Sequence, residues 1–199
     1  MEWDKKSDMR ARILVAARVI FERFGYAKTT VDDIARQMGK GKSSIYYYYA
    51  GKEEIFRAVL GQEIEHLKER ILTAVDGCND PKEKLSAYVR ERMHGLQQLK
   101  NLYTVLRSEF SANPEFAAET RAQADNEEFT IMTGILSHGV EAGIFRLDDV
   151  RLTAIAIVTA LKGMEIPLVI TGDQSETLLH QRLDGLVDIL FYGILRRNE

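Results

Sequence analysis

Apolar residues recur at spacings of three and four along almost the whole chain, with polar or charged residues between them. This spacing places the apolar side chains on one face of an α-helix. From Pro81 onward no alternating pattern of a β-strand appears, and glycines, prolines and short polar stretches divide the helical pattern. We therefore expect an all-α protein of about nine helices, over residues 4–24, 29–38, 42–49, 53–75, 81–99, 101–111, 114–142, 149–171 and 175–197.

The segment from Thr29 to Tyr49 predicts two short helices joined by a turn. Thr29 or Thr30 can cap the first helix, because a threonine oxygen accepts hydrogen bonds from backbone N–H groups of the first turn. Gly39 ends this helix, and Gly41 follows it in a turn too short to fold by itself. Two short helices around a glycine-containing turn are typical of a helix-turn-helix.

The second short helix is rich in hydroxyl groups and carries four consecutive tyrosines. Successive residues of a helix point about 100° apart, so only some of these tyrosines can be buried. We expect Ile45 and Tyr49 on the inner face, with Tyr46 beside them. The exposed residues then offer hydrogen-bond donors and aromatic edges, which suit phosphates, base edges and thymine methyl groups. This exposed set is Lys42, Ser43, Ser44, Tyr47 and Tyr48.

A set of short motifs carries a family resemblance: FERFG at 21–25, TTV at 29–31, DIA at 33–35, Gly39, the run 42–48 and KE at 52–53. In these residues, roughly the first quarter of the chain, it resembles the DNA-binding domain of the TetR family of bacterial transcriptional repressors. The family usually has an aliphatic residue at Lys40, Ser at Gly41, Phe at Tyr49 and Ser at Gly51. Glycine caps a helix less well than serine, although it is tolerated.

The resemblance implies two domains: residues 1–52 as a helix-turn-helix DNA-binding domain, and residues 53–199 as a helical domain for effector binding and dimerisation. It also implies a homodimeric repressor that a small molecule releases from a palindromic operator in double-stranded DNA. By matched position, Lys42 reads bases with Ser43, Ser44 and Tyr47 beside it, while Tyr48, Lys52 and the turn at Thr29 and Thr30 hold phosphates. The full set of expected DNA-binding residues is Thr29, Thr30, Lys42, Ser43, Ser44, Tyr46, Tyr47, Tyr48 and Lys52.

The charge distribution supports a nucleic-acid partner for the N-terminal part only. The net charge of the 199 residues is -3, which taken alone argues against such a partner. Residues 1–52, however, hold 11 Lys or Arg against 6 Asp or Glu, a charge of +5, while the rest holds 16 against 24, a charge of -8. A basic head on an acidic body is expected when only the head meets phosphate.

Composition also bounds the location of the protein. Cys78 is the only cysteine, so an intramolecular disulfide and a thiolate metal cluster are excluded. The first ten residues are charged and have no apolar stretch of signal-peptide length. The longest apolar run, at 152–161, is too short to span a membrane. We expect a cytoplasmic protein with no membrane association.

The last two predicted helices are apolar on more than one face. A helix that is exposed to solvent on one side needs an apolar stripe only about 100° wide. The additional apolar surface of these two helices therefore implies a partner. The resemblance agrees, since TetR-type repressors dimerise through their final two helices; the alternative is that the whole surplus is internal core. The expected interface residues are Leu152, Ile155, Leu179, Leu183, Leu186 and Leu190.

An effector pocket is implied by the resemblance, among the helices at 81–142 and the inward face of the helix at 149–171. Plain core packing is the alternative for each candidate, and Arg92 could face either a ligand carboxylate or a neighbouring Glu. A helix-turn-helix regulator with no small ligand is a further alternative. The candidates are Tyr88, Arg92, Leu96, Tyr103, Leu106, Phe110, Phe129, Met132, Leu136, Leu161 and Met164.

The hypothesis that the protein is an enzyme rests on two Glu-x-x-His pairs, Glu63 with His66 and Glu91 with His94. In a helical bundle this spacing is found in di-metal carboxylate sites. Such sites also need a single Glu from a helix between the two pairs, whereas here the pairs lie on adjacent predicted helices. No nucleophile-base motif or glycine-rich phosphate loop is present. We therefore expect no catalytic residue, no metal and no cofactor.

Overall fold

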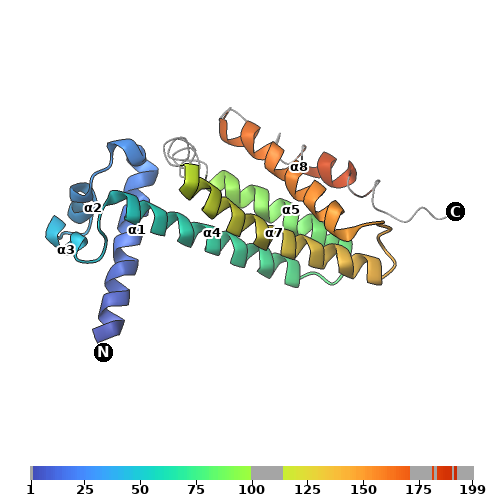
Figure 1. The fold of residues 1–199 in the computed structure, drawn as a ribbon, viewed down its shortest axis with the longest axis horizontal. Coiled ribbons are helices and arrows are strands. Elements are labelled where there is room, and N and C mark those ends of the chain that lie inside the picture. The colour runs from blue at the N-terminus through green and yellow to red at the C-terminus, as the bar shows by residue number, and fades with distance from the viewer. Residues whose placement is uncertain (1, 100–113, 171–180, 182, 190, 192–199) are drawn as a thin grey trace. The chain divides into compact units, whose positions relative to one another are not determined.

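The computed structural model describes residues 2–99, 114–170, 181, 183–189 and 191 (Figure 1). These residues confirm the all-α class, because they form helices and contain no β-strand. The predicted helix at 101–111 and most of the one at 175–197 lie outside them. The helices are α1 Glu2–Lys28, α2 Val31–Gln37, α3 Lys42–Tyr46, α4 Lys52–Asp76, α5 Pro81–Gln98, α7 Pro114–Glu141 and α8 Val150–Ile170.

The chain divides into two compact units within α4, between His66 and Leu67. The first turns of α4 belong to unit 1 because they supply part of its core: Ile55, Phe56 and Val59 are at most 2% exposed. The expected division at residues 52 and 53 concerns domain function and stays a prediction. The two units are described separately below.

Unit 1 is held together by an aromatic cluster between α1 and α4. The rings of Phe21 and Phe56 meet edge to face with centroids 5.2 Å apart, and Tyr26 lies 5.9 Å from the first and 5.0 Å from the second. Ile13 and Ala17 continue the buried face of α1 at helical spacing. Helix α2 packs on α1, and α3 packs on α2.

Gly25 interrupts α1, as the sequence predicts. Its φ of 75° and ψ of 167° are not helical, and a positive φ is easily adopted by glycine. The chain then makes one more turn, Tyr26 to Lys28, before α2. The Thr29 hydroxyl donates a hydrogen bond of 2.7 Å to the Gly25 carbonyl and so ties the two sides of the kink together.

The caps of α2 and α3 decide where these short helices begin and end. Thr30 is the N-cap of α2, and its hydroxyl oxygen accepts from the Asp33 N–H at 3.2 Å. Gly41 caps α3 without a side chain. We expected α3 to reach Tyr49, but it ends at Tyr46 because the Tyr48 N–H turns to the Ile45 carbonyl at 2.9 Å and tightens the last turn.

Unit 2 is built around α5, α7 and α8, which pack against one another (Figure 1). Tyr88, Val89 and Met93 of α5 are fully buried, as are Met132 and Leu136 of α7. Where α4 meets α5, the approach is close: a Cβ on Gly95 would lie 2.1 Å from Leu67 Cδ1. Glycine at this position therefore lets the two helices approach. Leu183 and Val187 from the last described segment join the same core.

Three carboxylates on one turn of α7 each pair with a cation from a different helix. Asp125 pairs with Lys162 of α8. Glu127 lies 3.0 Å from Lys68 of α4. Glu128 accepts from Arg92 of α5 at 2.9 Å and 3.2 Å, and the Arg92 side chain is only 2% exposed. We call these six residues the α7 charge row.

Candidate nucleic-acid interface

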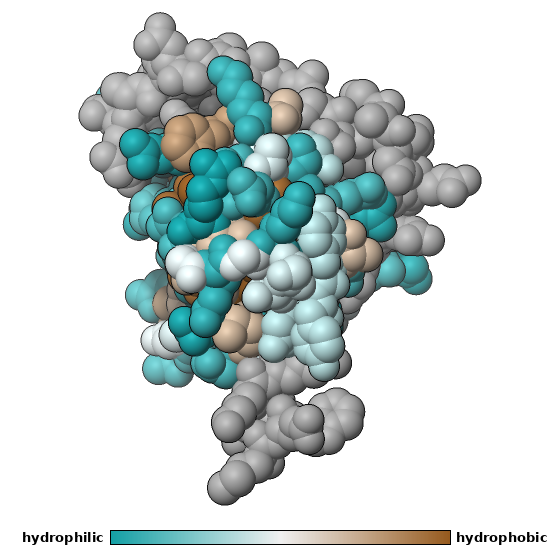
Figure 2. Space-filling model, turned by 90° about the vertical axis from the view of Figure 1, so that its left-hand side faces the viewer, coloured by the Kyte–Doolittle hydropathy of each residue, from teal (hydrophilic) through white to brown (hydrophobic). Residues whose placement is uncertain are grey.

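The outer face of α3 is polar and open to solvent, as expected. Lys42, Ser43 and Ser44 are exposed, and Tyr47 is 71% exposed. On the inner face Ile45 and Tyr49 are 1% and 3% exposed, which confirms that they face the core of unit 1. Figure 2 shows the side that carries α2 and α3, and hydrophilic residues make up most of its coloured surface.

Two tyrosines differ from the expected division of α3. Tyr46 was expected beside the inner face, but it is 52% exposed. The prediction was wrong because the helix ends at this residue and the chain then changes direction. Tyr48 is half-buried rather than open, and its ring meets that of Tyr47 edge to face with centroids 4.9 Å apart. Tyr46 and Tyr47 are therefore the two open aromatic side chains of α3 and its cap.

The residues expected at phosphates are less available than those on α3. Thr29 is 1% exposed, and its hydroxyl is bonded to the Gly25 carbonyl, so its side chain offers nothing to DNA. Thr30 is exposed, but its hydroxyl donates to Asp33 Oδ2 at 2.6 Å. Lys52 donates to the Tyr26 carbonyl at 2.9 Å and lies over the Tyr26 ring at 4.1 Å from its centroid.

The Thr30–Asp33 pair also sets the ionisation of the carboxyl group. Asp33 Oδ2 accepts from the Thr30 hydroxyl and from the Thr30 N–H at 2.9 Å, forming a capping box. These two hydrogen bonds, with a smaller contribution from Arg36, hold the pKa of Asp33 below its ordinary value of 3.8, and slight desolvation opposes them. Asp33 is consequently an anion at the start of α2, where the helix dipole favours it.

Seven cations of unit 1 fall into two groups. Arg12, Arg18, Arg36 and Arg57 each lie within 4.0 Å of at least one carboxylate of the same unit. In contrast, three exposed lysines form no ion pair with any residue that the structure describes. These are Lys28, Lys40 and Lys42, which we call the open lysines. They flank the start of α2 and the start of α3.

Lys28 and Lys40 were not among the expected site residues. The sequence-based prediction gave weight to the positions that match the family motif and missed lysines at or just beyond the ends of helices. The available signal was local: Lys40 stands between two glycines, and Lys28 has no acidic residue three or four positions before it on its helix. A lysine that finds no internal carboxylate keeps its charge available for phosphate.

The residues expected to line an effector pocket are packed together in unit 2. Tyr88, Met132, Leu136 and Leu161 are 0% exposed, and Arg92 is paired with Glu128. Leu96, Phe129 and Met164 are half-buried against the same core. Tyr103, Leu106 and Phe110 lie outside the described residues. The pocket role of this group remains a prediction.

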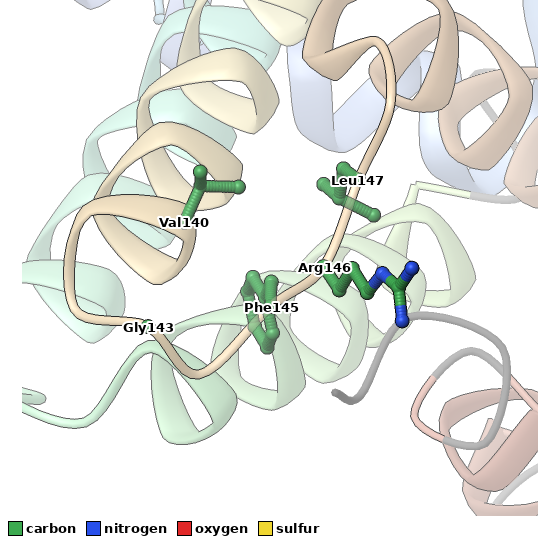
Figure 3. A pocket seen from close by; sticks show the side chains of 5 residues that line it. All are labelled: Val140, Gly143, Phe145, Arg146 and Leu147. Atoms are coloured by element: carbon green, nitrogen blue, oxygen red, sulfur yellow. The ribbon is translucent and has the colours of Figure 1, made fainter. Parts of the chain in front are cut away.

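An open pocket of about 480 Å³ lies elsewhere in unit 2, at the connection from α7 to α8. Figure 3 shows Val140 at the end of α7 and Phe145 and Leu147 in the connection, with Arg146 directed outward. Gly143 completes the lining. None of these residues was predicted as a ligand contact.

The residues expected at a dimer interface separate by exposure. Leu152 is 63% exposed and Ile155 40% exposed on α8, so both are available to a partner. Leu183 is 3% exposed within the single chain because it packs in the core of unit 2, and its interface role stays a prediction. Leu186 is half-buried against that core, and Leu179 and Leu190 lie outside the described residues. Ile189, which was not predicted, is 70% exposed.

The Glu-x-x-His residues find other partners. Glu63 lies 2.8 Å from Arg18, and Glu91 pairs with Arg70. A carboxylate that neutralises an arginine is a poor metal ligand unless the arginine moves away. Among the described residues no group of three His, Cys, Asp or Glu side chains is arranged to hold a metal ion.

Comparison with known proteins agrees with the fold and the helix-turn-helix. A family model described as bacterial regulatory proteins, tetR family, matches residues 13–59. A second, described as tetracyclin repressor-like, C-terminal domain, matches residues 78–166. The HTH-type transcriptional repressor KstR2 of Mycolicibacterium smegmatis is 30% identical over 148 residues, which cover 72% of this chain and 71% of that protein.

Two further relatives extend the agreement. The HTH-type transcriptional activator FasR of the same organism is 24% identical over 159 residues, covering 78% of this chain and 72% of FasR. A crystal structure of a transcriptional regulator from Cytophaga hutchinsonii superposes with a TM-score of 0.81 at 27% identity, covering 92% of this chain and 97% of that one.

The chain belongs to the TetR family and is a helix-turn-helix DNA-binding transcriptional regulator. Dimers and release by a ligand are typical of this family. Within the described part of the chain, no helix has both the length and the apolar character needed to cross a membrane.

Proposed function

We propose that the protein is a homodimeric cytoplasmic repressor that reads a palindromic operator with α3 and leaves it when a small molecule binds unit 2. The observation that carries the DNA-reading part is the outer face of α3: Lys42, Ser43, Ser44 and Tyr47 are exposed while Ile45 and Tyr49 anchor the helix. A helix presented in this way can enter the major groove of DNA.

Lys42 is the proposed base reader, because it is exposed at the first turn of α3 and forms no ion pair with a described residue. A lysine in the major groove can donate to the O6 and N7 acceptors of guanine. Ser43, Ser44 and Tyr47 beside it supply hydroxyl groups to neighbouring bases or phosphates. Lys28 and Lys40 are proposed to bind phosphates and to position α3 in the groove.

The dimer surface is proposed on α8 and the last helical segment. Leu152 and Ile155 lie one turn apart and are both exposed, which is costly for large apolar side chains in water. Ile189 adds a third exposed apolar residue from the last segment. A second copy of the chain that covers this surface would hold two α3 helices about 34 Å apart, the spacing of successive major grooves.

The effector is proposed to open the core of unit 2 around Arg92 and Glu128. KstR2 of Mycobacterium tuberculosis is described as a ketosteroid transcriptional regulator, and a regulator of this fold from Saccharomonospora viridis was solved with choline. Ligands of this size would need space that Tyr88, Met132 and Leu136 now fill. A ligand can shift the equilibrium toward the form released from DNA only by its differential affinity for that form.

The DNA-reading proposal is tested by footprinting and by binding to the DNA upstream of the gene for this protein. We expect a protected palindrome, and we expect Lys42→Ala to weaken binding by about 1–3 kcal/mol for each base contact and to relax the preference at one position of each half-site. Lys82→Ala on α5 is the matched control. Unchanged affinity and preference in Lys42→Ala would remove Lys42 from the interface.

The dimer proposal is tested by sedimentation. Replacing Ile155 with Arg should convert the dimer into a monomer, because a charge in an apolar interface is desolvated without a partner. The matched control is Thr130→Arg on the exposed part of α7. A dimer that persists in Ile155→Arg, or wild-type protein that sediments as a monomer, would contradict the proposed interface.

A further inference from the structure

Two cations of unit 1, Arg10 and Lys52, lie on tyrosine rings, although Lys52 was expected at phosphate. Arg10 comes from α1, and Lys52 is the first residue of α4. We call the connection between α3 and α4, residues 47–51, the α3–α4 corner. Arg10 contacts Tyr49 of this corner, and Lys52 directly follows the corner in sequence. The corner follows α3 directly and contains the buried Tyr49, so a contact that holds the corner also restrains the end of α3.

Arg10 joins α1 to the corner through two groups. Its guanidinium carbon lies 4.6 Å from the centroid of the Tyr49 ring, and Tyr49 is 3% exposed. Its Nη2 lies 3.9 Å from Glu54 Oε1. The other oxygen of Glu54 accepts a hydrogen bond from the Ala50 N–H. Arg10 thus contacts both the ring that anchors the corner and the carboxylate that binds the corner's backbone.

Lys52 fixes the far end of the corner to the end of α1. Its Nζ donates to the Tyr26 carbonyl at 2.9 Å and lies 4.1 Å from the centroid of the Tyr26 ring. The same ring packs on Phe21 and Phe56. The ammonium group therefore closes the aromatic cluster that holds α1 against α4, with its charge directed at an acceptor inside the protein.

We propose that Arg10 and Lys52 are positioning residues for DNA reading: they hold the α3–α4 corner against α1 and do not bind phosphate. The proposal rests on the DNA-binding function above. Each of the two cations already meets a ring and a carboxylate or carbonyl of unit 1, whereas the open lysines have no such partner among the described residues. Cations over aromatic rings are stabilised by the negative face of the ring, and more strongly as they lose water.

The consequence for binding differs from that of removing a phosphate ligand. If the clamp formed by Arg10 and Lys52 is removed, α3 samples several orientations in the free protein, and specific binding must first order it. Non-specific binding depends on neutralising phosphates and needs no fixed orientation of α3. Removal of a positioning residue should therefore lower the affinity for the operator alone, while removal of a phosphate ligand should lower both affinities and the salt dependence.

The experiment measures binding of the full-length protein to an operator duplex and to a random duplex of equal length across a salt series. Arg10→Gln and Lys52→Gln should each weaken operator binding about tenfold, since a dimer would be without two copies of an interaction of modest strength. Binding to the random duplex and the salt slope should not change. Arg12→Gln is the matched control, because Arg12 pairs with Asp8 of its own helix.

Further variants identify the ring as the partner. Tyr49→Phe keeps the ring and should bind like the wild type, whereas Tyr49→Leu should behave like Arg10→Gln, and the two effects should not add. Arg10→Lys should restore most of the operator affinity. If Arg10→Gln does not fold, Arg10→Lys and Tyr49→Phe still test the proposal. Both keep the cation and the ring, so both should bind the operator nearly as well as the wild type. Weak operator binding by these two variants would contradict a positioning role.

Several results would overturn the inference. Equal weakening on both duplexes, with a salt slope smaller by about 0.9 for each phosphate that is no longer neutralised, would make Arg10 or Lys52 a phosphate ligand. Unchanged operator binding would remove any role. If the wild-type protein shows no sequence preference, the DNA-reading proposal is rejected instead. The clamp is then tested by hydrogen exchange: the Ala50 amide should exchange faster in Arg10→Gln than in the wild type. Unchanged exchange of this amide would overturn the clamp.

Discussion

The two units of the protein use positive charge in opposite ways. In unit 2 the cations of the α7 charge row, Lys68, Arg92 and Lys162, come from three helices and meet three carboxylates on one turn of α7. In unit 1 the open lysines lie at the end of α1, between α2 and α3, and at the start of α3, and they meet no described carboxylate. The first group is part of how the unit is assembled, and the second is available to a ligand.

The difference shows that a basic residue near a motif is evidence of a ligand only after its internal partners are known. The surplus of five positive charges in residues 1–52 is real, yet several of those cations are matched by carboxylates, a carbonyl or a ring within unit 1. The open lysines are exposed lysines of unit 1 that meet no described carboxylate. Counting charges cannot separate these groups, because a count does not show which carboxylate, carbonyl or ring each cation meets.

The largest effect on stability is expected from replacing Arg92 of the α7 charge row. Arg92→Met leaves Glu128 partly buried without its cation and should destabilise the protein by about 3 kcal/mol, measured by chemical denaturation. Arg90 is the matched control on the same helix, since its pair with Asp184 is 62% and 57% exposed. Arg90→Met should change stability by less than about 1 kcal/mol. Equal effects would contradict the structural role given to the buried pair.

The smallest effect concerns Asp33 of unit 1, whose charge is matched locally. Its pKa is lowered in the folded protein, so ionised Asp33 contributes stability above the ordinary pKa of 3.8 and this contribution is lost as the pH falls through the lowered value. Asp33→Ala should therefore be less stable than the wild type at neutral pH, with the difference shrinking in acid. Thermal melts from pH 7 to pH 2 measure it, and a difference that grows in acid would contradict the capping box.

Much of unit 1 could be predicted from sequence because short-range rules decide it. The apolar period places Ile45 and Tyr49 inside, and the Thr30 cap and Gly39 bound α2. The position of Tyr46 could not be predicted in this way, because it depends on where α3 ends. The internal partner of Lys52 could not be predicted from local rules either, because the Tyr26 carbonyl to which it donates is 26 residues away in sequence.

In unit 2 the sequence predicts which residues are buried better than it predicts which of them line a pocket or an interface. The period marks Met132, Leu136 and Leu161 as inward, and they are. Periodicity cannot distinguish a residue that lines a cavity from one that fills a core, since both face inward. Leu183 illustrates the same limit for interfaces: an apolar side chain on a two-faced helix can meet its own chain or a partner, and here it meets its own chain.

The salt dependence of operator binding tests the central claim most directly. Each phosphate that a variant no longer neutralises should reduce the slope of log K against log salt by about 0.9. Lys28→Gln/Lys40→Gln should therefore reduce the slope by roughly 3.6 for a dimer, which carries four such lysines. Arg12→Gln/Arg36→Gln, which removes two paired cations, should leave the slope within about 0.5 of the wild type. The reverse order, or equal reductions, would contradict the division between open and internally paired cations.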